Sequence, residues 1–103
     1  MIYKVQLTQQ AKQDLHGIYE YIAFSLLEPE IAKKLKNRIV VGLNSLKEMP
    51  GRYPLYQEEP WKSRGLRRIN IENYSGFYLV SESTVKVVRI SYGGRDISRI
   101  LKD

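Results

Sequence analysis

Apolar and polar residues alternate near the start of the chain. Within residues 2–7, Tyr3, Val5 and Leu7 fall on one side of an extended backbone and polar side chains lie between them. A spacing of two residues between apolar positions is typical of a strand with one buried face. The sequence therefore predicts a short, half-buried strand here.

The apolar spacing then changes to three and four residues, which is typical of a helix with one buried face. Ala11, Leu15, Ile18 and Ile22 follow this spacing. Thr8 precedes them, and its side chain is suited to accept a hydrogen bond from the first free backbone N–H groups. The sequence predicts a helix over about residues 9–26.

A second helix is predicted to begin at Glu28-Pro29-Glu30 and to end at Pro50-Gly51, because proline fits the first helical turn and glycine follows the last. Its apolar positions are Ile31, Leu35, Ile39, Leu43 and Leu46. The joint between the two helices, near Leu27, is very short. Such a joint predicts an antiparallel helical hairpin.

The second half of the chain predicts a sheet. Proline, tyrosine and tryptophan residues over positions 50–64 indicate an irregular loop that packs on the domain, because large aromatic side chains seek burial. Three strand-like runs follow, at residues 66–71, 77–80 and 85–91. The short connections between these runs predict an antiparallel meander, and a brief closing helix is expected after it.

The expected fold class is therefore α+β. It consists of an N-terminal strand and an antiparallel helical hairpin packed on one face of a C-terminal antiparallel β-meander. A chain of 103 residues with 43% hydrophobic residues has the size of one compact domain, so residues 1–103 are assigned to a single domain.

The formal charge is +6, and the excess lies toward the C-terminal half, which carries +4 against +2 for residues 1–49. This balance favours contact with nucleic acid or with an acidic protein. The sequence contains no cysteine, which excludes disulfides and thiolate metal sites and suits a reducing compartment. No stretch approaches the roughly 20 apolar residues of a membrane span, so we expect a cytoplasmic protein.

Strand alternation predicts which side chains of the meander face the helices. Those expected toward the helices are Ile69, Ile71, Phe77, Leu79, Val88 and Ile90. Those expected on the uncovered face are Arg68, Asn70, Tyr78 and Arg89, with Tyr92 and Arg95 at its rim. Guanidinium groups beside tyrosine rings suit phosphates and unpaired bases, although a polar face without a ligand is equally compatible with these residue types.

Standard catalytic and metal-binding arrangements are missing. His16 is the only histidine, and without a cysteine or a second histidine it completes neither a metal site nor a catalytic triad. We therefore expect His16 to be a structural or a surface residue, and we expect neither a metal nor a cofactor.

Three segments resemble one known family. They are Gly65-Leu66-Arg67-Arg68, residues 73–78 (NYSGFY) and residues 89–97 (RISYGGRDI). Together with the order of elements, they resemble the RelE/ParE superfamily of toxins of type II toxin–antitoxin systems. The resemblance implies a growth-inhibiting toxin with a role in plasmid stabilisation. It also implies a cognate antitoxin, which the positive charge predicts to be acidic, and a homodimer or a heterotetramer with that antitoxin.

The resemblance leaves two branches open. RelE-like members cleave mRNA on the ribosome, and in this sequence Arg68, Arg95 and Tyr78 would carry that catalysis. The set is incomplete, because Asn70 and Tyr78 stand where basic residues are expected and the tail after Arg95 has no histidine or tyrosine. Either Tyr78 or Tyr92 could substitute in proton transfer, but a tyrosine phenol with an unshifted pKa is a poor base at neutral pH.

ParE-like members bind DNA gyrase and need no catalytic residues, and the Arg-Asp-Ile ending is more similar to this branch. We therefore favour a ParE-like toxin that is not an enzyme. Its target-binding residues would be Arg68, Asn70, Arg89, Tyr92 and Arg95. A ribosome-dependent nuclease is the first alternative, and a non-toxic basic module that binds nucleic acid or protein is the second.

Overall fold

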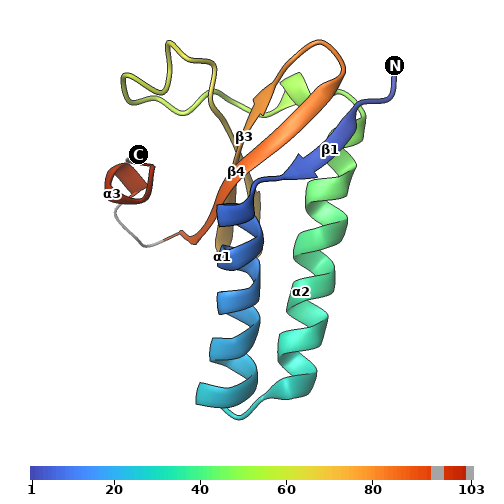
Figure 1. Ribbon diagram of the computed structural model, residues 1–103, viewed down its shortest axis with the longest axis vertical. Helices are drawn as coiled ribbons and strands as arrows, with labels where there is room; N and C mark the ends of the chain where they lie inside the picture. The colour runs from blue at the N-terminus through green and yellow to red at the C-terminus, as the bar shows by residue number, and fades with distance from the viewer. Residues whose placement is uncertain (94–96, 102–103) are drawn as a thin grey trace.

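A computed structural model describes residues 1–93 and 97–101 of the chain. In chain order its strands and helices are β1 (Lys4–Leu7), α1 (Gln9–Glu20), α2 (Pro29–Asn44), β2 (Arg67–Ile71), β3 (Tyr74–Val80), β4 (Thr84–Tyr92) and α3 (Ile97–Ile100). A π-helical turn, Tyr21–Ser25, extends α1, and 3₁₀ turns follow α2 at Ser45–Lys47 and Pro50–Arg52. The α+β fold class and the order of elements are confirmed (Figure 1).

The four strands form one mixed sheet in the order β1-β4-β3-β2. β2, β3 and β4 are the predicted antiparallel meander, and β1 joins it by pairing in parallel with β4, Val5 lying beside Val85. The alternation of apolar residues does not say which strand β1 pairs with. The sequence prediction therefore did not include the parallel pairing of β1 with β4.

β3 begins earlier than predicted. Tyr74 to Gly76 were expected in the connection, but they pair with β2 and β4, so only Glu72 and Asn73 form the turn. A Cβ at position 76 would lie 2.9 Å from Cδ2 of Leu43, so glycine lets α2 pack this close without a shift of the leucine side chain. The glycine thus marks the close approach of α2 to the sheet.

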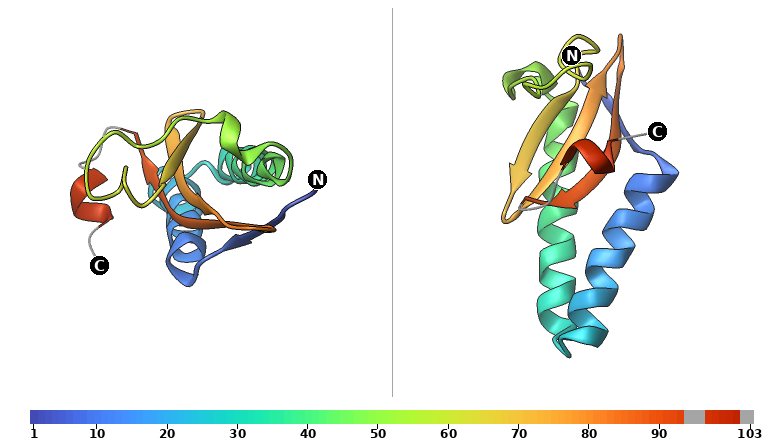
Figure 2. Two further views of the ribbon diagram at one scale, coloured as in Figure 1. Left: turned by 90° about the horizontal axis from the view of Figure 1, so that it is seen from above. Right: turned by 90° about the vertical axis from the view of Figure 1, so that its left-hand side faces the viewer.

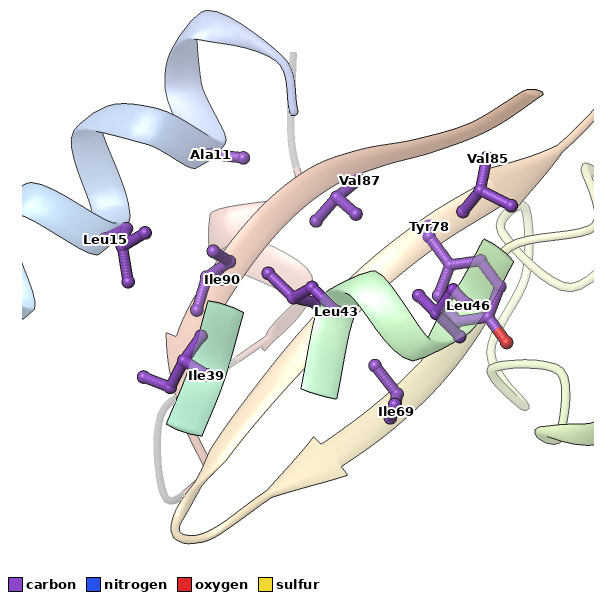
Figure 3. Close-up of a cluster of buried hydrophobic side chains, with 10 residues drawn as sticks. All are labelled: Ala11, Leu15, Ile39, Leu43, Leu46, Ile69, Tyr78, Val85, Val87 and Ile90. Carbon is purple, nitrogen blue, oxygen red and sulfur yellow. The ribbon is translucent and has the colours of Figure 1, made fainter. Parts of the chain in front are cut away.

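The hairpin of α1 and α2 packs on one face of the sheet, as predicted (Figures 1 and 2). Thr8 caps α1, since its Oγ1 accepts a hydrogen bond from the Ala11 N–H at 3.1 Å. Between the hairpin and the sheet lies the main core cluster (Figure 3), which consists of Ala11, Leu15, Ile39, Leu43, Leu46, Ile69, Tyr78, Val85, Val87 and Ile90.

A second, smaller cluster lies on the other face of the sheet. Its buried members are Tyr56, Leu66, Phe77 and Leu101, with Trp61, Leu79, Val88 and Ile100 packed against them. In the right-hand view of Figure 2, α3 lies on the near side of the sheet and α2 behind it. The face expected to be uncovered is therefore covered in part, by α3 and by the loop before β2.

The loop before β2 packs on the domain, as expected. Tyr56 is buried, and its backbone N–H donates to the carbonyl of Leu66 at 2.8 Å.

Among the described helices, none combines the length and the apolar character that a membrane crossing requires.

Candidate functional site

Arg68 and Asn70 share the face of β2 that points away from α1 and α2, as predicted, because Ile69 between them is buried in the main core. The Nε of Arg68 donates to Oδ1 of Asn70 at 3.1 Å and to Oγ of Ser75 at 3.0 Å. The Ser75 hydroxyl in turn donates to Asn70 Oδ1 at 2.9 Å. These three side chains form one hydrogen-bonded group, called the Arg68 cluster below.

The cluster orients the guanidinium of Arg68. Its carbon lies 5.8 Å from the centroid of the Phe77 ring, and the Nε is held by Asn70 and Ser75. Within residues 1–93 and 97–101, the two terminal nitrogens of Arg68 have no hydrogen-bond partner and no carboxylate pairs with them. A planar fork of N–H donors held in this way suits a phosphate or a carboxylate.

The Arg68 cluster opens into a shallow hollow at the β2–β3 turn. Besides the cluster, its walls include Glu72, Asn73, Tyr74, Tyr92 and Gly93, and its volume is about 320 Å³. The ring of Tyr92 is half exposed and meets the ring of Tyr74 edge-on, with the centroids 5.6 Å apart. Tyr92 therefore lies at the rim, as predicted, and offers an aromatic surface beside the cation.

The acidic residue at this hollow is paired elsewhere. Glu72 accepts from Nη1 of Arg38, on α2, at 2.9 Å. Because Glu72 pairs with Arg38, it does not pair with Arg68, and Arg68 is the basic one among the described residues that line the hollow. Burial, followed by the neighbouring Tyr92 and Tyr21, raises the pKa of Tyr74, so its phenol stays protonated at neutral pH.

Tyr78 does not belong to this site, and the prediction that it lies on the uncovered face is wrong. It is fully buried in the main core, and its hydroxyl donates to the carbonyl oxygen of Pro50 at 2.6 Å. Phe77 and Leu79, which were expected toward the helices, pack in the second cluster instead. Burial raises the pKa of Tyr78 to about 12.

The reason for this error is that β3 is apolar at both parities over Phe77, Tyr78 and Leu79. In such a strand, alternation predicts which residues share a face, but it does not predict which of the two faces the helices cover. The hydroxyl of Tyr78 is satisfied by a carbonyl from a distant loop. The sequence gives no sign of that partner.

Arg89 is tied into the fold. Its Nε and Nη2 donate to the carboxylate of Asp14, on α1, at 2.8 and 3.0 Å, and its Nη1 donates to the carbonyl of Ile100 at 2.7 Å. The hydrogen bond to Asp14 is the main cause of the raised pKa of Arg89. Its guanidinium thus joins α1 and the C-terminal segment to β4, in place of the free cation expected from the sequence.

A bulge in the ladder between β3 and β4 explains this position. Phe77 pairs with Arg89 and Tyr78 pairs with Val87, so Val88 is the extra residue. Val88 packs in the second cluster, so the prediction that it faces the helices is wrong, whereas Ile90 lies in the main core as predicted. Asp14 also accepts from the Ile90 N–H at 2.9 Å, a role that the sequence analysis missed.

The last predicted site residue, Arg95, lies outside the described residues. Of the other predicted residues, the structure brings Arg68, Asn70 and Tyr92 to one hollow and separates Tyr78 and Arg89 from it. Ser75 is the member of the Arg68 cluster that sequence reasoning missed. It is buried and polar within a strand, and a serine at that position was the one available signal.

A second hollow, of about 240 Å³, lies on the same side of the sheet, and Trp61, Arg64, Leu66, Leu79 and Val88 are among its lining residues. The guanidinium carbon of Arg64 stands 5.2 Å from the centroid of the Trp61 ring. This hollow can accept an apolar side chain beside a cation.

Among the described residues, no group of three or more His, Cys, Asp or Glu side chains is arranged to hold a metal ion.

Comparison with known proteins assigns the chain to one family. The family described as the ParE toxin of type II toxin–antitoxin systems, parDE, matches residues 5–97. A search among curated proteins finds no significant match.

Three solved structures with a similar fold are chains of toxin–antitoxin systems. A chain of the chromosomal ParDE system from P. aeruginosa is 24% identical with a TM-score of 0.74, and the match covers 88% of this chain and 96% of that one. A chain of the RelBE2 complex from Mycobacterium tuberculosis is 20% identical with a TM-score of 0.62, covering 89% and 92%. A chain of the archaeal RelE–RelB complex from Pyrococcus horikoshii is 18% identical with a TM-score of 0.63, covering 93% and 100%.

Proposed function

Since the chain belongs to the ParE family of toxins of type II toxin–antitoxin systems, we propose that it inhibits bacterial growth by binding DNA gyrase and trapping it on cleaved DNA. The observation that carries this proposal is the family match, which extends over residues 5–97 and so includes the hairpin, all of the sheet except Lys4, and Arg95. Inhibition by binding needs a surface that recognises the target and needs no acid–base pair.

The Arg68 cluster supports this proposal. The Arg68 fork is oriented by two neutral partners, Asn70 and Ser75, and a charge held in this way loses little freedom when it binds an anion. We assign Arg68, Asn70 and Tyr92 to the target-binding surface, and Arg95 remains a proposed member. Arg89 acts on this surface only indirectly, through the position of β4 and α3.

The cognate partner is an antitoxin, and we propose that its toxin-binding segment is acidic. The chain carries a formal charge of +6. A partner of opposite charge associates faster, and the rate falls as salt screens the attraction. We further propose a heterotetramer with the antitoxin or a homodimer, in the cytoplasm.

Ribosome-dependent cleavage of mRNA is the alternative function. It would require a group that removes a proton from the RNA 2′-hydroxyl and a cation on the phosphate. Arg68 suits the second role. Tyr78 was one of two candidates for the first role, with Tyr92, and the burial and raised pKa of Tyr78 disfavour it.

One experiment separates the two functions. Purified protein is incubated with gyrase and supercoiled DNA, and separately with translating ribosomes. We expect linear DNA covalently linked to gyrase, and less of it with Arg68→Gln. Lys33→Gln is the matched control, because it removes one charge from an exposed position on α2. Codon-spaced cuts in mRNA, with no effect on gyrase, would overturn the proposal.

A further inference from the structure

The tip of the α1–α2 hairpin exposes large apolar side chains. In Figures 1 and 2, the hairpin extends well past the end of the sheet, so the tip has no layer to cover it. The exposed apolar residues there are Tyr21, Phe24, Leu26, Leu27 and Ile31, of which Phe24 is 66% and Leu27 78% accessible. A group of exposed apolar residues of this size indicates an interaction surface.

The backbone at the tip is unusual as well. α1 ends in the π-helical turn Tyr21–Ser25, a conformation that is frequent at functional sites. Leu27 then adopts a left-handed conformation with φ of 56°. Glycine is the usual residue in this position after a helix, because a Cβ is disfavoured there. A strained leucine that points into solvent contributes little to the stability of the fold.

The charge of the tip differs from that of the rest of the molecule. Residues 15–32 contain Glu20, Glu28 and Glu30 and no lysine or arginine, which gives −3 within a chain of +6 and leaves +9 for the remainder. All three glutamates are exposed, and Glu20 lies 3.3 Å from the imidazole of His16 one turn earlier. Lys33 and Lys34 begin the basic part of α2 within one turn of Glu30, so the acidic character is confined to the end of the hairpin, where it favours contact with a basic protein surface.

We propose that the hairpin tip is the element by which this toxin docks on its target protein. Phe24 and Leu27 enter an apolar pocket on that protein, and lysine or arginine residues around the pocket pair with Glu28 and Glu30. The inference rests on the proposed function, since the occupant is the gyrase target itself. It assigns recognition of protein to the tip and recognition of anions to the Arg68 cluster.

The test compares two glycine substitutions, Leu27→Gly and Met49→Gly. Met49 is a matched control, because it is also left-handed, with φ of 49°, is 73% exposed, and lies beyond the other end of α2. The binding of each variant to purified gyrase with supercoiled DNA is measured by surface plasmon resonance. We expect Leu27→Gly to weaken binding by at least about tenfold and Met49→Gly to leave it unchanged. Both variants keep the wild-type thermal midpoint or exceed it, because glycine relieves the strain.

A second variant keeps the inference open to contradiction. Phe24→Ser removes an exposed ring without changing the backbone of the turn, and it is expected to weaken gyrase binding as Leu27→Gly does. If wild type binds gyrase and both tip variants bind equally well, the inference is overturned and the proposed function stands. If wild type does not bind gyrase, the proposed function fails and the inference fails with it. If light scattering finds a wild-type dimer that Leu27→Gly converts to monomer, the tip joins two copies of the chain, and the inference is overturned.

Discussion

The two faces of the sheet are both apolar in part, but they are covered in different ways. On one face, two long helices bury the main core completely, including the hydroxyl-bearing Tyr78. On the other face, α3 and the loop before β2 bury the smaller cluster around Phe77 and leave the Arg68 cluster open beside it. From this difference we expect the helical face to supply most of the stability and the partly covered face to be the one that binds a partner.

The largest expected effect is on the free energy of unfolding, and it compares one leucine from each face of the sheet. Leu43→Ala removes a side chain that is 2% exposed and packs against Gly76 and Ile69. We expect it to lower the free energy of unfolding by about 2–5 kcal/mol, through lost burial and the cavity left behind. Leu79→Ala, on the other face, removes a partly buried side chain and is expected to cost roughly half as much. Equal losses in urea denaturation would show that the faces contribute alike.

The next effect concerns the ion pair between Asp14 on α1 and Arg89 on β4. Asp14→Ala removes the acceptor of the Arg89 guanidinium and of the Ile90 N–H, and both charged side chains are largely buried, 24% and 17% exposed for Arg89 and Asp14. We expect a loss of about 1–3 kcal/mol, because donors to a charged group are left unpaired. Arg89→Ala should lose a similar amount by thermal denaturation. A variant of Arg89 that keeps full stability but loses target binding would restore its predicted role as a binding residue.

A smaller effect concerns Tyr78 on the helical face. Tyr78→Phe loses the hydrogen bond to Pro50 and leaves its carbonyl without this donor, at a cost of about 0.5–1.5 kcal/mol at neutral pH. The pKa of Tyr78 is raised in the folded protein from 10.0 to about 12. The contribution of this group to stability is therefore fully present below pH 10.0 and is lost as the pH rises toward about 12.

Denaturation at a series of alkaline pH values checks this prediction. Wild type should lose stability more steeply than Tyr78→Phe through this range, because the variant has no proton to release at that position. Parallel curves for the two proteins would contradict the burial of the Tyr78 phenol.

The smallest effect on stability is expected at the open part of the sheet. Arg68→Gln removes a charge whose terminal nitrogens have no partner among the described residues, while the Ser75–Asn70 hydrogen bond remains. We expect the free energy of unfolding to change by less than about 1 kcal/mol, by urea denaturation, although gyrase binding falls. A loss comparable to that of Leu79→Ala would mean that Arg68 is mainly structural.

The sequence by itself determined the local elements of this protein. The spacing of Ala11, Leu15, Ile18 and Ile22 predicted α1, and the short joint near Leu27 predicted the hairpin. On β2, a polar residue on each side of the buried Ile69 was enough to place Arg68 and Asn70 together. These features are set by periodicity and by contacts between near neighbours in the chain, which a sequence displays directly.

Only the tertiary structure decided which face of β3 and β4 the helices cover. Both parities of β3 are apolar, and the bulge at Val88 shifts the register of β4, so the pattern was compatible with either face. The partners that settle the matter are distant in the chain, Pro50 for Tyr78 and Asp14 for Arg89. A buried hydroxyl or guanidinium requires a partner, but its residue type does not say which segment will supply it.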